Sequence, residues 1–247
     1  SSAVWAARQP PARTHPLKCD PPLQRFDRPI MNHEQARFNM VEQQIRTWNV
    51  LDTPILQALS QLERERFVPL AYQSLAYTDT EIPLGHGQSM LAPKVAARLA
   101  HDLNLQGQET VLEIGAGSGY LTALLAQRCK RVLALEIVPE LATLARNNLA
   151  QAGIGNTEVR TGDGSQETPS EGPFDAIVLS GSVAEVPQHL LNQLKLGGQL
   201  IAIVGQEPVM QATLTQRVSE QQWRSRALWD ICVPALNGFP QPSRFKF

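Results

Sequence analysis

The sequence predicts an α/β fold, a doubly wound and mostly parallel sheet with an N-terminal helical segment. Short apolar runs typical of buried strands alternate with helical patterns between residues 110 and 205. A cluster of three glycines lies between the first of these strands and the next helix, and acidic residues follow the next two strands. Alternation at such short intervals is typical of βαβ units, in which helices cover both faces of a parallel sheet.

The part of the chain before the first strand is expected to contain helices and one long loop region. Apolar residues between 40 and 48 recur at helical spacing. Asp52 suits the N-cap of the next helix, which has a proline in its first turn and ends near the motif RFVP at 66–69. Residues 70–93 are rich in turn-forming residues, and Pro93 is expected to begin a third helix.

The region after residue 104 carries the alternating pattern. The expected strands are 110–115, 131–136, 157–163, 174–181 and 197–205, and the expected helices are 121–128, 139–153 and 186–194. Beyond residue 205 the chain is less regular. The stretch WRSRALWDICVP there indicates one or two closing strands in antiparallel orientation.

The composition argues against several classes of protein. With 43% hydrophobic residues the chain of 247 residues has material for a sizeable core, and its net charge of -1 is unlike that of a nucleic-acid-binding protein. No apolar run approaches the roughly 18 residues that a membrane span requires. Cys19, Cys129 and Cys232 lie far apart, which favours free thiols in the reducing cytoplasm over a metal site.

The strongest motif is VLEIGAGSGY at 111–120. Gly115, Gly117 and Gly119 follow a strand and precede a helix, and such a turn lets the backbone approach a ligand closely. The spacing G-x-G-x-G differs from the G-x-G-x-x-G of dinucleotide-binding proteins, and the lysine of a phosphate-binding P-loop is missing. An ordinary tight turn between a strand and a helix would give the same pattern.

Acidic residues at the ends of the next two strands strengthen the case for a ligand. Glu136 is placed to accept hydrogen bonds from a ribose diol, although an acid at the start of a helix would also explain it. Asp163, followed by Gly164, suits the exocyclic amine of an adenine, although Asp-Gly also forms turns. Because the carboxyl ends of parallel strands share one edge of a sheet, the three features together predict a cofactor that contains a nucleoside.

These motifs resemble those of Rossmann-like S-adenosylmethionine-dependent methyltransferases, and the chain is similar to the protein-L-isoaspartate (D-aspartate) O-methyltransferase family. The similar segments run in family order over about two-thirds of the chain: MVEQQIR (40–46), RFVP (66–69), AYTDTEIPLGHGQS (76–89), VLEIGAGSGY, GDG and PFDAIVLSG (173–181). The tail, LWDICVPALNGFPQPSRFKF, does not match the usual family ending.

The resemblance implies a reaction and a set of roles. The family transfers a methyl group from S-adenosylmethionine to the free α-carboxylate of an isoaspartyl residue in a damaged protein, which is a repair reaction and leaves S-adenosylhomocysteine. Glu136 would bind the ribose hydroxyls, and Asp163 and Gly164 would face the adenine. Gln88 and Ser89 would lie near the sulfonium and the acceptor. The residues lining the methionine and ribose side would be Glu113, Gly115, Gly117 and Gly119.

One position departs from the family pattern. The family loop usually reads G-Q-T-I-S-x-P, and its serine is the assigned catalytic group. Aligned on Gly87, Gln88 and Pro93, that serine falls on Leu91, which neither donates nor accepts a hydrogen bond. Two alternatives to isoaspartyl repair therefore stay open, a methyltransferase with another acceptor and a cofactor-binding protein without turnover. An NAD-dependent oxidoreductase is disfavoured by the glycine spacing.

The resemblance and the composition together predict the domain organisation. Residues 1–30 hold six of the 18 prolines and no periodic apolar pattern, so they are expected to be a disordered or extraneous extension. Residues 31–247 are expected to form a single methyltransferase domain. Its parts would be a substrate-side segment (31–104), a cofactor-binding core (105–205) and closing strands with a tail (206–247). The N-terminal helical segment is expected to pack over the mouth of the cofactor site. The partner would be a protein or peptide, and the sequence predicts no oligomeric state.

Overall fold

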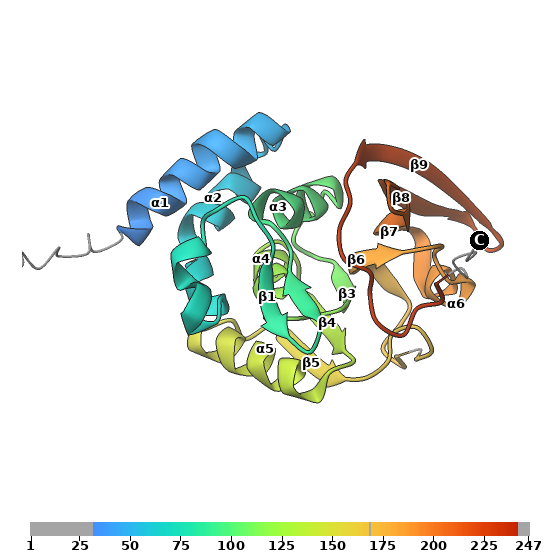
Figure 1. Cartoon of the computed structure of the whole chain (residues 1–247). Coiled ribbons are helices and arrows are strands. Elements are labelled where there is room, and N and C mark those ends of the chain that lie inside the picture. The colour runs from blue at the N-terminus through green and yellow to red at the C-terminus, as the bar shows by residue number, and fades with distance from the viewer. Residues whose placement is uncertain (1–31, 168, 242–247) are drawn as a thin grey trace, which may run out of the picture. The chain divides into compact units, whose positions relative to one another are not determined.

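The computed structural model describes residues 32–167 and 169–241, and these residues fall in one compact unit (Figure 1). The expectation for residues 1–30 lies outside the described residues. Nothing in the described ranges tests the division of the remaining chain into three functional parts.

A seven-stranded sheet forms the centre of this unit, in the order β5-β4-β3-β6-β7-β8-β9. The strands are β3 (Thr110–Ile114), β4 (Arg131–Glu136), β5 (Thr157–Thr161), β6 (Phe174–Val183), β7 (Leu194–Gln206), β8 (Val209–Ser219) and β9 (Gln222–Asp230). Strands β3 to β7 pair in parallel, and β8 and β9 are antiparallel additions. The predicted α/β fold with a mostly parallel sheet is confirmed.

Helices occur where the periodicity predicts them. The helices are α1 (His33–Met40), η1 (Val41–Ile45), η2 (Arg46–Trp48), α2 (Thr53–Gln61), η3 (Arg64–Phe67), η4 (Leu70–Leu75), α3 (Pro93–Asp102), α4 (Tyr120–Ala126), α5 (Pro139–Gln151) and α6 (Gln188–Asn192). The first predicted helix begins earlier than expected and continues through a π turn and a 3-10 turn. Asp52 caps α2 as predicted, since its side chain accepts a hydrogen bond from the Ile55 amide at 3.2 Å.

Two strand segments were not expected. The turn-rich region contains a hairpin of β1 (Ile82–Gly85) and β2 (Gln88–Met90), and both residues of its turn, His86 and Gly87, have positive φ. Such a turn matches the twist of a hairpin, but strands this short carry no readable alternation. After residue 205 the expected antiparallel closing strands are present, and β9 falls largely in the stretch that predicts them. The chain before that stretch is more regular than expected, because β8 is 11 residues long.

The two faces of the sheet are buried under different elements. One core joins alternate residues of β3 and β4, such as Val111 and Val132, to helices α2 to α5. The second core lies on the opposite face and joins Leu112 and Leu133 to Leu190 of α6. Coverage of both faces explains the nearly continuous apolar sequence of these strands. The strand order also reverses at β3 and β6, which creates a switch point at the carboxyl edge of the sheet.

The Asp52 cap gives a test of this part of the fold. Replacing Asp52 with Ala is expected to lower the free energy of unfolding by about 1 kcal/mol, because the Ile55 amide loses its acceptor. Urea denaturation measures the change. Asp52→Asn keeps a side-chain oxygen and should stay within about half of that loss. Equal losses in both variants would show that the cap contributes through its charge and not through this hydrogen bond.

Candidate active site

The glycine loop after β3 occupies the switch point. Gly115, Gly117 and Gly119 have φ values of 91°, 53° and 84°, which side-chain-bearing residues rarely adopt. A Cβ on Gly119 would also lie 3.3 Å from the Ala145 backbone of α5. On the same side, the Asn148 side chain donates a hydrogen bond to the Ser118 carbonyl at 2.9 Å. The loop is therefore held against α5 in a conformation that glycine permits.

Glu136 joins the glycine loop to the next strand end. The residue is buried, with an exposed fraction of 4%. One oxygen accepts a hydrogen bond from the Gly117 amide at 2.8 Å, and the other accepts one from the Val138 amide at 3.0 Å, just before α5. Glu136 also lines a small cavity with Gly115 and Gln88. It thus satisfies backbone donors at the start of a helix and still faces a space next to the glycine loop.

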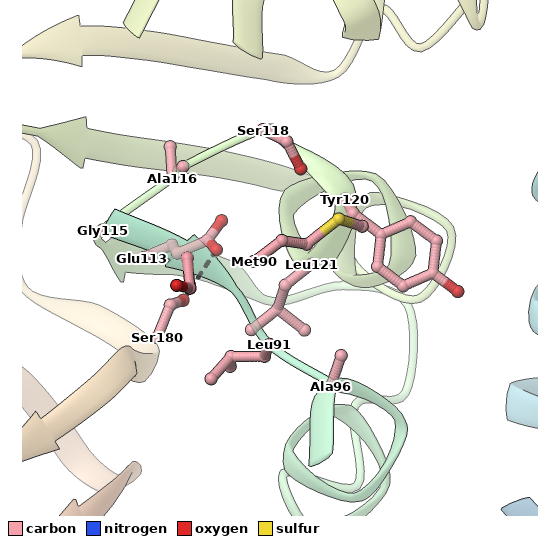
Figure 2. A pocket seen from close by; sticks show the side chains of 12 residues that line it. Met90, Leu91, Ala96, Glu113, Gly115, Ala116, Ser118, Tyr120, Leu121 and Ser180 are labelled. Carbon is pink, nitrogen blue, oxygen red and sulfur yellow. Dashed lines mark hydrogen bonds between the residues drawn. The ribbon is translucent and has the colours of Figure 1, made fainter. Parts of the chain in front are cut away.

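Glu113 of β3 is a buried carboxyl group with incomplete hydrogen bonding. Its side chain is fully buried, and the Ser180 hydroxyl donates to one of its oxygens at 2.8 Å (Figure 2). The other oxygen has no hydrogen-bond partner among the residues that the structure describes. Burial raises the pKa of Glu113 to about 7. A donor or cation placed against the second oxygen would satisfy it, which is what a cofactor with an ammonium group offers.

Neighbouring residues of the hairpin strand β2 line two different cavities. We call these cavities the first cavity, about 30 Å³, and the second cavity, about 20 Å³. Ser89 lines the first cavity together with Glu113, Gly115 and Ser180, whereas Gln88 lines the second. Because side chains alternate along a strand, consecutive residues reach opposite sides of it. The two hairpin residues expected near the reaction therefore lie in different cavities.

Leu91 lies in the first cavity, as Figure 2 shows. It is 7% exposed and shares the cavity wall with Ala96 of α3 and Leu121 of α4. Because position 91 has no hydroxyl, this side of the cavity is an apolar wall. The hydrogen-bonded side chains of Glu113 and Ser180 form the other side.

The acid after β5 is bound within its own turn. Asp163 accepts hydrogen bonds from the Ser165 amide at 2.9 Å and from the Gln166 side chain at 3.1 Å. Gly164 lines the second cavity, whereas Asp163 does not line either of the two. The turn-forming role of Asp163 is therefore visible in the structure, and its contact with an adenine stays a prediction.

The C-terminal segment contributes residues that sequence reasoning missed. Ser182 exchanges backbone hydrogen bonds with Pro234 and Leu236, both at 2.9 Å. The Leu236 side chain then lies over Gly115, only 2.7 Å from the point that a Cβ on this glycine would occupy. Asn237 lines the second cavity. This irregular segment has no apolar periodicity from which its position could be predicted. Only its pairing with Ser182 brings it next to the glycine loop.

The N-terminal helical segment was expected to cover the mouth of the site. In the structure α1 and α2 do not line the two cavities, and α2 contacts α3 and α4 instead. The amphipathic face of α2 explains this, since its buried residues Ile55, Leu56 and Leu59 belong to the core on that side of the sheet.

Comparison with known proteins gives a consistent result. The family model described as protein-L-isoaspartate(D-aspartate) O-methyltransferase matches residues 35–234. A protein-L-isoaspartate O-methyltransferase of Methanoculleus marisnigri is 43% identical over 171 residues, covering 69% of this chain and 78% of the relative. One of Myxococcus xanthus is 47% identical over 156 residues, covering 63% of this chain and 74% of the relative.

A solved structure supports the fold. The crystal structure of a putative protein-L-isoaspartate O-methyltransferase of Plasmodium falciparum, in complex with S-adenosyl-L-homocysteine, superposes with a TM-score of 0.69. The match covers 83% of this chain and 98% of the other at 23% sequence identity. The residues over the second cavity, Leu236 and Asn237, lie just beyond the range matched by the family model.

The buried carboxyl group gives the test of this site. The folded protein raises the pKa of Glu113 from 4.5 to about 7, so ionisation of Glu113 opposes folding between these pH values. Glu113→Gln should therefore leave the stability of the ligand-free protein unchanged below pH 4.5. Above pH 4.5 the variant should become more stable than the original protein. The difference between their free energies of unfolding should grow up to pH 7 and stay at about 3 kcal/mol above pH 7.

Urea denaturation between pH 4 and pH 8 measures this difference. Glu207→Gln, at an exposed position in the turn before β8, is the control and should show no comparable trend. A stability difference that does not change with pH would show that Glu113 is not a buried group titrating near neutrality.

Proposed function

The chain belongs to the protein-L-isoaspartate(D-aspartate) O-methyltransferase family, and we propose on this premise how its site performs the reaction. The protein is an S-adenosylmethionine-dependent O-methyltransferase that methylates the α-carboxylate of L-isoaspartyl residues in proteins. The observation that carries the proposal is the first cavity, which brings Ser89 of the hairpin next to Glu113 and the glycine loop.

The reaction makes few chemical demands on the side chains. S-adenosylmethionine supplies a methyl group already activated by a sulfonium. The acceptor carboxylate is an anion at neutral pH and needs no general base. The site must hold the acceptor oxygen about 3 to 3.5 Å from the methyl carbon and exclude water. Met90, Leu91 and Leu121 form the apolar wall that would exclude water.

The residues around the two cavities fit this cofactor. We infer that the unpaired oxygen of Glu113 binds the ammonium group of its methionine part. Gly115, Gly117 and Gly119 would allow its close approach, and Glu136 would bind the ribose hydroxyls from the second cavity. Gly164 would lie next to the adenine, with Asp163 accepting from its amine. Gln88 and Ser89 would stand between the cofactor and the acceptor.

The residue at position 91 affects how the acceptor carboxylate can be oriented. Its side chain cannot orient a carboxylate, whereas the Ser89 hydroxyl lines the same cavity and can donate a hydrogen bond. We propose that Ser89 and backbone amides orient the acceptor in place of the family serine. The apolar wall at Leu91 favours one alternative, a member of the family that prefers another acceptor. A cofactor-binding protein without turnover is the second alternative.

The acceptor is a protein or peptide, and we propose a cytoplasmic location. None of the helices within the described ranges has the length and hydrophobicity that a membrane crossing requires. Cys129 and Cys232 are free thiols, which suits a reducing compartment. In the same ranges no group of His, Cys, Asp and Glu side chains is arranged to bind a metal ion.

Transfer of radiolabelled methyl from S-adenosylmethionine tests the proposal. The acceptors are a peptide that contains isoaspartate and the same peptide with normal aspartate. Label is expected on the isoaspartyl peptide alone. Protein that binds S-adenosylhomocysteine but labels neither peptide would contradict the proposal and favour one of the two alternatives. Labelling of a host lysate by such protein would then indicate a different acceptor.

A substitution at Leu91 tests the role of the missing hydroxyl. Leu91→Ser is expected to raise kcat/KM for the isoaspartyl peptide by about tenfold, because one added donor to the carboxylate stabilises the transition state by roughly 1.4 kcal/mol. Leu91→Ala opens the cavity without adding a donor and serves as the control. Equal gains in both variants would assign the effect to space instead of hydrogen bonding.

A further inference from the structure

A buried arginine lies between the helical segment and the active site. Arg64, at the start of η3, is fully buried. No carboxylate lies within ion-pair distance of it in residues 32–167 and 169–241. A buried charge without an ionic partner is costly, so its contacts must be specific to offset that cost.

The hydrogen bonds of Arg64 go to two backbone carbonyls. Its Nε donates to the Ala76 carbonyl at 2.7 Å, and one terminal nitrogen donates to the Leu91 carbonyl at 2.7 Å. Leu91 lies between β2 and α3, outside the helices and strands, so its carbonyl has no ladder partner within residues 32–167 and 169–241. The planar guanidinium thus connects the segment before the hairpin to the segment after it, and it fixes both ends of the acceptor loop, residues 76–91.

The same guanidinium also contacts the cofactor side. Its central carbon lies 4.4 Å from the centre of the Tyr120 ring. Tyr120 is the first residue of α4 and follows Gly119 directly, and it lines the first cavity. A guanidinium over an aromatic face is attracted by the ring, more strongly so in a buried place. Arg64 therefore contacts the acceptor loop at one end and the glycine loop's helix at the other.

We propose that Arg64 is a positioning residue that sets the placement of the acceptor loop relative to the cofactor loop. The inference rests on the proposed function, because that reaction requires an acceptor oxygen and a methyl carbon in line. Arg64 touches neither reacting group. Its hydrogen bond to Leu91 and its contact with Tyr120 hold the two walls of the first cavity at a fixed separation, and a small displacement of one wall strongly lowers the rate.

Two substitutions separate this role from simple packing. Arg64→Lys keeps a positive charge but loses the fork that reaches both carbonyls. Arg64→Met keeps much of the volume and removes the buried charge. Leu194→Ala is the matched control, because Leu194 is fully buried in the core on the opposite face of the sheet. It should destabilise the fold without touching the first cavity.

The measurements are the S-adenosylhomocysteine dissociation constant and the kinetics of methyl transfer to the isoaspartyl peptide, well below each melting temperature. For both Arg64 variants we expect kcat/KM for the peptide to fall at least tenfold and cofactor affinity to change less than threefold. Leu194→Ala should stay within threefold in both. Three results would each overturn the proposal. The first is that the Arg64 variants lose peptide turnover and cofactor affinity by the same factor. The others are that Leu194→Ala loses as much peptide turnover as the Arg64 variants do, or that turnover in the Arg64 variants is unchanged.

Hydrogen exchange tests the role of Arg64 without requiring methyl transfer, so the inference and the proposed function can fail separately. Should the original protein bind S-adenosylhomocysteine but methylate neither peptide, the proposed function fails while Arg64 is still testable. Arg64→Lys is then expected to exchange amides of β1 and β2 at least tenfold faster, with β4 and β5 unchanged. Equal exchange in the hairpin would overturn the inference. So would failure of both variants to fold, because it would assign Arg64 to core stability alone.

Discussion

The hydrogen bonds of the Glu136 carboxylate hold the site together. The amides of Gly117 and Val138 lie at the end of a sheet, where neither has a backbone acceptor among the described residues, and one side chain from β4 satisfies both. This arrangement fixes the glycine loop against the next strand before any ligand is present. The same carboxylate side chain lines the second cavity, so one group supports the local fold and is available for the expected ribose contact.

The first cavity combines two opposite environments within a short distance. Glu113 and Ser180 supply a polar side whose acceptor capacity is not fully used, and Leu91, Leu121 and Ala96 supply an apolar side. A low-polarity wall strengthens electrostatic interactions nearby and excludes water. Arg64 binds the Leu91 carbonyl, so this hydrogen bond does not involve the Leu91 side chain. A leucine can therefore replace a polar residue at this position without removing that hydrogen bond.

The sequence predicts those parts of the structure whose signal is local. Strands β3 to β7 are buried on both faces and appear as apolar runs, and the carboxyl-edge rule places Gly115 and Glu136 together. Local sequence patterns do not predict contacts between residues that are far apart in the chain. Arg64 acts on a carbonyl 27 residues away, and Leu236 reaches Gly115 through pairing with Ser182. Strand β8 does carry a local signal that was not recognised, since its buried residues Met210, Ala212 and Leu214 alternate with polar ones as in a half-buried strand.

The proton on Glu113 has a consequence for how ligand binding is measured. With a pKa of about 7, the ligand-free protein at neutral pH is a mixture of protonated and ionised forms in comparable amounts. A positively charged group bound against this carboxylate selects the ionised form and releases protons to the solution. The heat of binding then includes the ionisation enthalpy of the buffer. Calorimetry in phosphate and in Tris would give the same affinity with different apparent enthalpies.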